Sequence, residues 1–201
     1  MGLSGKVTVL MAAYNVENYI AEAIQSILDQ TYDDFTFLII NDASTDKTED
    51  VILSFNDKRI VYKKNPINLG VGKTVHDGMD MIDSKYVVRF DADDISFPNR
   101  IETLVNYLEN NLTIPIASSF FEVFGGAFPH VNLVEDPLQL RTRALFDCPV
   151  SQYIILDNHF LKRNGINYNP NLRVAEDYDL YLRVLRKADI AKVPEVLVKY
   201  R

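Results

Sequence analysis

The sequence predicts an α/β fold, in which a mostly parallel central sheet carries helices on both faces and is followed by a mixed, less regular half. Apolar strand-like runs alternate with helix-like segments over the first part of the chain. Such alternation is typical of parallel strands joined by crossover helices. Several predicted strands also end in polar residues, and the carboxyl ends of parallel strands form the edge where ligands bind.

In the first half, four strands are expected at runs rich in β-branched and aromatic residues: 6–14, 35–41, 59–64 and 86–90. Apolar residues at helical spacing predict the helices that follow them: 15–30, 44–55, 70–83 and 98–110. The second helix begins in a Ser/Thr/Asp cluster, the third is entered through glycines, and Pro98 suits a first helical turn.

The second half has a less regular pattern. Its expected elements are an antiparallel strand, three helices and a last strand: 116–126, 137–146, 156–165, 176–188 and 195–201. We therefore expect a single domain over 1–201, with one half at 6–110 and the other at 111–201.

Composition indicates a folded domain with an acidic surface. Of the 201 residues 47% are hydrophobic, and the formal net charge is −7. Disorder is not expected at this hydrophobic content, and a nucleic-acid partner is not expected without a positive face. Cys148 is the single cysteine, which excludes an internal disulfide and fits a reducing compartment. The sequence shows no secretory leader and no run of ~20 apolar residues, so we expect a cytoplasmic protein.

Three carboxylates, Asp91, Asp93 and Asp94, follow the strand expected at 86–90. Crowded carboxylates repel one another, and a divalent cation relieves the repulsion. Mg²⁺ and Mn²⁺ prefer oxygen ligands, and Mg²⁺ commonly takes one or two carboxylates together with substrate phosphates. The alternative is that these residues only end the strand, with Asp94 or Ser96 capping the helix at Pro98.

Four motifs in order give the chain a resemblance to glycosyltransferase family 2, strong over 6–110 and weaker over 117–126 and 170–200. The motifs are "TVLMAAYNVENYIAEAIQSILDQTY", "FLIINDASTDKT", "NLGVGKTVHDGMDMIDSKYVVRFDADDISFPNRI" and "AEDYDLYLRVL". The resemblance implies a GT-A fold with a Rossmann-like nucleotide-binding half at 6–110 and an acceptor and catalytic-base half at 111–201. It also implies inverting transfer of a sugar from a nucleotide diphosphate sugar, with UDP-sugars the expected donors.

Site residues follow from the resemblance by position. The nucleotide-sugar site would comprise Ala13, Tyr14, Asn15, Asp42, Lys73, Asp91 and Ala92. Asp93, together with Asp91, would hold Mn²⁺ or Mg²⁺. Asp177, with Glu176 as the second candidate, would be the catalytic base.

Each role has an alternative that the sequence leaves open. Asp42 can accept an N–H from uracil, but it also suits a turn. Tyr14 would stack on the base or belong to the core, and Lys73 would meet a phosphate or be a solvated lysine. Arg89 is expected to support the site or to pair with a neighbouring carboxylate.

Inversion needs a base that takes the proton of the acceptor hydroxyl. Asp177 opens a predicted helix, whose positive N-terminus favours a charged carboxylate. The alternative is that Glu176, Asp177 and Asp179 only complement the dipole of that helix.

Two other functions remain open at this stage. One is a non-catalytic module that binds sugar nucleotides, and the other is an Asp-dependent phosphohydrolase, although in that class the D-x-D motif follows the first strand rather than the fourth. The resemblance further implies a glycan or lipid-linked acceptor and polysaccharide biosynthesis. It predicts that the chain is truncated at its C-terminus, with a peripheral contact to the inner face of the plasma membrane through the missing region.

Overall fold

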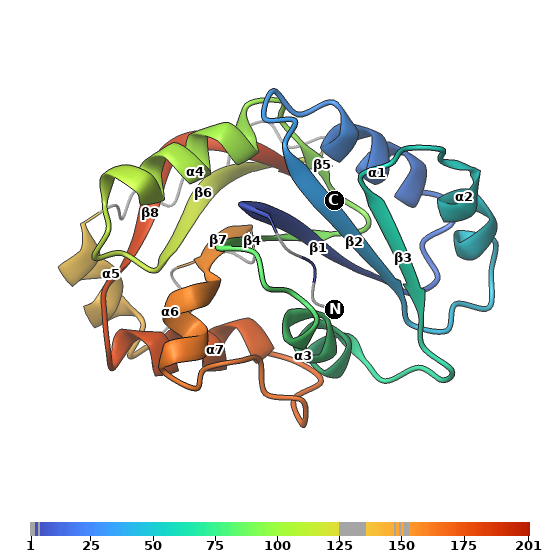
Figure 1. Cartoon of the computed structure of the whole chain (residues 1–201). Helices are drawn as coiled ribbons and strands as arrows, with labels where there is room; N and C mark the ends of the chain where they lie inside the picture. The colour runs from blue at the N-terminus through green and yellow to red at the C-terminus, as the bar shows by residue number, and fades with distance from the viewer. Residues whose placement is uncertain (1–2, 4, 125–135, 147, 149, 151–152) are drawn as a thin grey trace.

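The computed structural model describes residues 3, 5–124, 136–146, 148, 150 and 153–201 (Figure 1). It confirms the α/β fold, with one curved sheet in the order β3-β2-β1-β4-β7-β6-β8-β5. The strands are β1 (Val7–Ala13), β2 (Phe35–Asn41), β3 (Ile60–Lys64), β4 (Tyr86–Asp91), β5 (Ile95–Ser96), β6 (Ile116–Val123), β7 (Ile154–Asp157) and β8 (Ile190–Tyr200). The helices are α1 (Ile20–Leu28), α2 (Thr48–Ser54), α3 (Val71–Asp80), α4 (Arg100–Asn110), α5 (Pro137–Arg143), α6 (Asn158–Arg163) and α7 (Glu176–Leu185).

The four strands of the first half are parallel, as predicted. β1 lies between β2 and β4, and Leu10 pairs with Leu38 on one side and Arg89 on the other. Strands buried on both faces read as continuous apolar runs, which is why their positions could be recognised from sequence.

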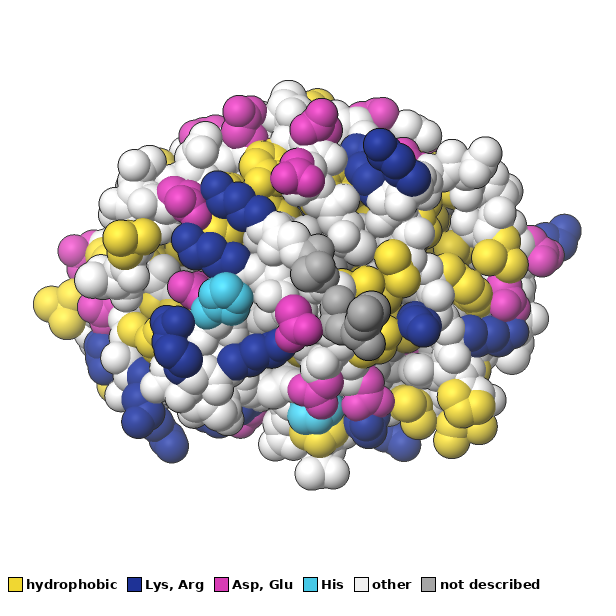
Figure 2. Space-filling model, in the orientation of Figure 1, with side chains coloured by type: hydrophobic (Ala, Val, Ile, Leu, Met, Phe, Trp, Pro, Cys, Tyr) yellow, Lys and Arg dark blue, Asp and Glu magenta, His cyan; other side chains and the backbone are white. Residues whose placement is uncertain are grey.

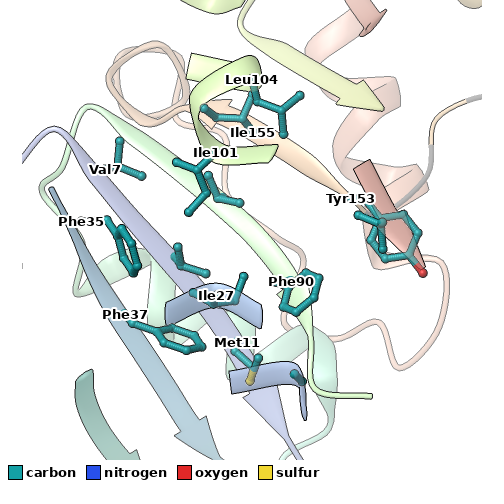
Figure 3. Close-up of a cluster of buried hydrophobic side chains, with 14 of the residues drawn as sticks. Val7, Met11, Ile27, Phe35, Phe37, Phe90, Ile101, Leu104, Tyr153 and Ile155 are labelled. Atoms are coloured by element: carbon teal, nitrogen blue, oxygen red, sulfur yellow. The ribbon is translucent and has the colours of Figure 1, made fainter. Parts of the chain in front are cut away.

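The sheet separates two apolar clusters. On one face α1 and α4 pack against side chains such as Met11, Phe37 and Phe90 (Figure 3). On the other face α3, α6 and α7 bury Val75, Leu161 and Leu180. Burial of apolar area on both faces is the main stabilising contribution to such a fold.

Residues 125 and 126 of the strand expected at 116–126 lie outside the described residues. Within the described part of the second half, three features differ from the expectation. β6 pairs antiparallel with β7 but parallel with β8. β7 was not predicted, and α6 begins only after it at Asn158, where the Asp157 side chain accepts a hydrogen bond from Phe160 N at 2.8 Å. β8 begins at Ile190 rather than at 195.

The helices of the first half are shorter than predicted at their N-termini, because polar residues there form loops. α1 begins at Ile20, and residue Asn15 instead adopts a positive φ of 52°. Val16 N donates to Thr48 Oγ1 at 2.8 Å, so the loops after β1 and β2 are tied together. None of the helices in the described ranges is long and apolar enough to cross a bilayer.

Gly72, in the first turn of α3, lies against the chain segment that leads to α7. A Cβ atom at this position would overlap the backbone carbonyl oxygen of Leu172, with Asn169 O also within 3.3 Å. A Cβ at Gly78, in the same helix, would meet only the side-chain ends of Leu10 and Ile40. Backbone cannot move aside as side-chain ends can, so α3 and the segment before α7 can pack this closely only with glycine at position 72.

We expect Gly72→Ala to lower the free energy of unfolding by about 1–3 kcal/mol, the usual cost of overpacking. Gly78→Ala is the matched control, since it adds the same methyl group to the same helix but meets side-chain ends rather than backbone. Urea denaturation of the two variants measures the difference. A Gly72→Ala variant as stable as Gly78→Ala would contradict this packing argument.

Candidate active site

Three strand ends meet at one edge of the sheet, as the sequence predicted. Ala13 pairs with Asn41 at the end of β2, and Ala12 pairs with Asp91 at the end of β4. The residues that follow these positions therefore share a single edge. Tyr14 is 46% exposed, so the core alternative for this side chain is wrong, and an aromatic face is open at the edge.

The loop after β1 is held to the loop after β2. Asn15 Oδ1 accepts from Thr45 N at 2.8 Å, and Asn15 N donates to Ser44 Oγ at 3.1 Å. Ala13 is buried, and its carbonyl accepts from Asp42 N at 2.8 Å. The predicted nucleotide-site residues Ala13, Tyr14 and Asn15 thus form one fixed loop.

Asp42 is almost fully buried, and both of its carboxylate oxygens accept hydrogen bonds from the chain. Oδ1 accepts from Asn65 Nδ2 at 2.7 Å and Leu69 N at 3.0 Å, and Oδ2 accepts from Gly70 N at 2.9 Å. Gly70 has φ +83° and precedes α3, a backbone conformation that glycine adopts at little cost. Asp42 therefore fixes the entry to α3 beside the strand ends.

Arg89 pairs with Asp91, one of the two outcomes expected for it. Arg89 Nη1 lies 2.8 Å from Asp91 Oδ1 and 2.9 Å from the carbonyl of Phe90. The Arg89 side chain is 2% exposed, whereas that of Asp91 is 25% exposed. Although burial alone would lower the pKa of Arg89, the charges of Asp91 and Asp177 raise it above its usual value. Arg89 is thus a permanent buried cation.

Asp93 and Asp94 have different environments although they are adjacent. Asp93 is partly exposed, and burial followed by the charge of Asp91 raises its pKa. Asp94 is buried, accepts from Tyr153 Oη and from Arg201 N at 2.8 Å each, and has its pKa raised to about 6 by burial. Asp94 is a packing residue. The capping alternative is wrong, because the N-cap residue of α4 is Asn99.

Asp91 and Asp93 fit a hard divalent cation. Both offer carboxylate oxygens at the strand end, and both are partly exposed while the buried Ala92 lies between them. The raised pKa of Asp93 reflects crowding as well as burial, and a bound cation would relieve that crowding. Two carboxylates are enough for Mg²⁺ when phosphates complete its coordination.

α7 brings the predicted base to the same site. Glu176 and Asp177 open this helix, and Ala175 before them adopts a left-handed φ of 59°. Asp177 Oδ1 is buried and has no partner at ordinary hydrogen-bond geometry, and the buried Tyr168 hydroxyl, which likewise has none, lies near enough to lower the pKa of Asp177. Burial raises the pKa of Asp177 to about 6, although the nearby Arg89 guanidinium opposes the shift. A carboxylate with a raised pKa and a free oxygen suits proton abstraction.

Two other residues have local partners that the sequence did not indicate. Lys73 forms an ion pair with Asp77 on the surface of α3. Asp179 forms one with Arg183 at 2.6 Å along α7. Lys73 lies in the first turn of α3, and its contact with a phosphate stays a prediction.

The sequence reasoning missed two arginines that shape the site. Arg100 is fully buried and donates from Nη2 to the carbonyl of Arg89 at 2.8 Å, with its guanidinium 5.0 Å from the Phe90 ring centroid. Arg201 donates from Nε to the carbonyl of Asp93 at 3.0 Å. Arg100 occupies the apolar stripe of its helix together with Leu104, which is a signal that could have identified it.

A second group of side chains that can act as metal ligands lies on α3. The ligand atoms of His76, Asp77 and Asp80 come within 4.8 Å of one another, and this is the one such group of three found among the described residues. Two of its members already have partners, because Lys73 pairs with Asp77, and His76 Nδ1 lies 2.7 Å from the carbonyl of Tyr168. The α3 group and the strand end thus each contain a carboxylate that is already paired with a cation, Asp77 with Lys73 and Asp91 with Arg89.

Comparison with known proteins gives the family. Residues 8–165 match the sequence model of the family described as "Glycosyl transferase family 2". An uncharacterized glycosyltransferase of Haemophilus influenzae is 35% identical over 97% of the chain and 65% of its own length. A second, from Methanocaldococcus jannaschii, is 33% identical over 97% of the chain and 70% of its own length. The Escherichia coli glucosyltransferase WfaP is 26% identical over 96% of the chain and 76% of its own length.

Solved structures agree on the fold. Staphylococcus aureus TarS 1–349 in complex with UDP-GlcNAc superimposes with a TM-score of 0.83 at 19% identity, covering 96% of this chain and 58% of that one. The Pyrobaculum calidifontis mannosyltransferase PcManGT, in complex with GDP-Man and Mn²⁺, gives 0.74 at 17% identity, covering 97% and 56%. The chain spans about two thirds of the length of the Haemophilus influenzae and Methanocaldococcus jannaschii relatives. It is a glycosyltransferase domain and belongs to glycosyl transferase family 2.

Proposed function

We propose that the domain transfers a sugar from a nucleotide diphosphate sugar, with a UDP-sugar as the first candidate, to a hydroxyl group of a glycan or lipid-linked acceptor. The observation that carries the proposal is the 2.8 Å pair of Arg89 with Asp91 at the end of β4, with Asp177 near enough for the Arg89 charge to lower its pKa. The full name of WfaP gives UDP-Glc as donor and a diphosphoundecaprenol-linked sugar as acceptor. TarS has been crystallised with UDP and UDP-GlcNAc, which supports a uridine donor here.

The reaction would be a single displacement with inversion. An acceptor oxygen forms the new bond to the anomeric carbon while the bond from that carbon to the diphosphate oxygen breaks. Asp177 would take the hydroxyl proton, since its pKa is raised to about 6 and its Oδ1 makes no hydrogen bond of ordinary geometry. Glu176, which is 8% exposed, is the second candidate for this role. Mn²⁺ or Mg²⁺ held by Asp93 and Asp91 would offset charge on the diphosphate.

The nucleoside would lie over the fixed loop of Ala13, Tyr14 and Asn15. The exposed ring of Tyr14 is available to stack on the base. Asp42 already accepts from Leu69 N and Gly70 N, so any contact with uracil would be in addition to its role in the loop. The backbone around Ala92 and the Lys73 ammonium group would lie toward the sugar and phosphates.

The first expected result is stabilisation by UDP with Mn²⁺. A ligand at 100 times its Kd adds about 2.7 kcal/mol to the free energy of unfolding, which is a rise of about 5–10 °C in melting temperature for a domain of this size. Asp93→Ala should remove the metal-dependent part of the rise. Asp80→Ala, which disrupts the group on α3, should keep it. If Asp80→Ala loses the rise instead, the metal site is wrong, and absence of a rise with every nucleoside diphosphate would contradict the donor class.

The second expected result concerns the base. Asp177→Asn should slow UDP release from a UDP-sugar by about 10²–10⁴-fold, the usual contribution of a general base, while keeping the stabilisation by UDP and Mn²⁺. Asp179→Asn, which alters the same helix end, is the control and should retain activity. Equal loss in both variants would favour a helix-dipole role for these residues. Binding without transfer in the unmodified chain would identify a non-catalytic module, and phosphate release without a nucleotide sugar would identify a phosphohydrolase.

The third expected result is a pH dependence of stability. The pKa of Asp177 is about 6 in the folded protein, above its ordinary value of 3.8, so the folded state binds more protons between these values. The free energy of unfolding should therefore fall as pH rises from about 4 to about 6, and Asp177→Asn should reduce that fall. Denaturation by urea at several pH values measures it. An unchanged slope in the variant would contradict the raised pKa.

A further inference from the structure

α5 and the turn that follows it have two apolar faces, one buried against the domain and one exposed to solvent. Leu140 and Ala144 are fully buried, whereas Leu138, Leu145 and Phe146 are 70%, 71% and 85% exposed. The turn after α5 continues its winding, with Ala144 N bonded to Leu140 O and Phe146 N to Arg143 O, each at 2.9 Å. The exposed residues therefore recur at i, i+7 and i+8 and lie on one side. Three large apolar side chains exposed together indicate an interaction surface.

Basic side chains lie around this stripe. By helical spacing Arg141 lies on one side of it and Arg143 on the other. A hollow of about 400 Å³ separates α5 from the end of α7 and is lined by Arg141, Leu145 and Arg186 among others. Lys187 follows Arg186, and both are exposed. Arg141 pairs with Asp189 and Asp136 caps the N-terminus of α5, so the basic side chains that face solvent beside the stripe without a carboxylate next to them in the chain are Arg186 and Lys187.

The stripe is at one end of the molecule, where α5 lies far from α2 (Figure 1). The space-filling view shows hydrophobic and basic side chains at that end, with acidic side chains among them (Figure 2). Arg141 fixes α5 to the body of the domain, because it donates to Asp189 Oδ1 at 2.6 Å and to the carbonyl of Leu185. The exposed side chains are therefore presented on a fixed support.

We propose that this face docks the domain on the surface of an anionic lipid bilayer. We define the α5 face as Leu138, Leu145 and Phe146 with Arg143, Arg186 and Lys187. A helix that lies in the membrane interface has an apolar stripe with arginine and lysine beside it. The apolar side chains enter the acyl boundary, and the long basic side chains reach the headgroup phosphates. The proposal uses α5 and α7 alone and does not rest on the proposed sugar transfer.

The charge pattern favours an anionic bilayer over a protein groove. A basic amphipathic helix that binds a protein groove presents apolar anchors at i, i+3, i+4 and i+7, whereas α5 has only 7 residues and its exposed apolar residues are Leu138, Leu145 and Phe146. The α5 face has a short apolar stripe with basic residues on both sides. This pattern complements a bilayer, whose acyl region is apolar and whose headgroup layer is anionic.

Vesicle sedimentation tests the proposal with the full chain. Vesicles of phosphatidylcholine alone and of phosphatidylcholine with one third phosphatidylglycerol are compared. We expect binding to the anionic vesicles and a strong reduction at about 1 M NaCl, where the Debye length is about 3 Å. The double change Leu145→Ser with Phe146→Ser should lower the bound-to-free ratio about tenfold or more, since it removes most of the apolar anchor. Arg186→Glu with Lys187→Glu should have an effect in the same direction.

Leu53→Ser with Lys58→Glu is the matched control. Leu53 is 58% exposed on α2, and Lys58 is an exposed lysine just beyond that helix. This variant should bind as the unmodified chain does, and all variants should keep their melting temperature because the changed side chains are exposed. Binding to neutral vesicles alone, no binding to anionic vesicles, or equal loss in the control would overturn the proposal. A dimer in solution that Leu145→Ser with Phe146→Ser converts to a monomer would assign the face to a second copy instead.

Discussion

The candidate site depends on the ion pairing of a buried guanidinium, that of Arg89 on β4, with the carboxylates around it. Arg89 pairs with Asp91 at 2.8 Å and opposes the rise in the pKa of Asp177, so one cation serves both the strand end and the first turn of α7. Carboxylates brought this close without a cation would take up protons rather than remain charged. Arg89 therefore allows two acidic segments far apart in sequence to share one sheet edge while at least part of their charge is kept.

The geometry of parallel strands explains why that edge is the site. β1, β2 and β4 end together, and the hydrogen bonds that close their loops come from polar residues just beyond each strand. Asp42 is a buried residue that supports this edge. Its carboxylate accepts hydrogen bonds from Leu69 N and Gly70 N and so fixes the backbone at the start of α3. Because hydrogen bonds already fix these loops, they lose little conformational entropy when a ligand binds to exposed residues such as Tyr14.

The first half of the fold could be predicted from sequence because its signals are local. An apolar run buried on both faces, such as β2, is recognisable without knowledge of its partners. β7 and the first residues of β8 could not be predicted, because four residues at 154–157 and the segment from 190 become strands only through pairing with β6. Tertiary context decides such short segments. The same limit applies to Arg201, whose contact with Asp93 joins the end of the chain to its middle.

Sequence spacing identified the acidic motif but could not assign a role to each carboxylate. Asp93 and Asp94 are neighbours, yet one is partly exposed and the other is buried against Tyr153. The chain turns at Ala92 and Asp93 as soon as β4 ends at Asp91. This turn leaves Asp91 and Asp93 partly exposed, whereas Asp94 is buried and accepts hydrogen bonds from Tyr153 Oη and Arg201 N. The conformation of the turn, rather than the number of carboxylates, thus decides which of the three side chains are available to a cation.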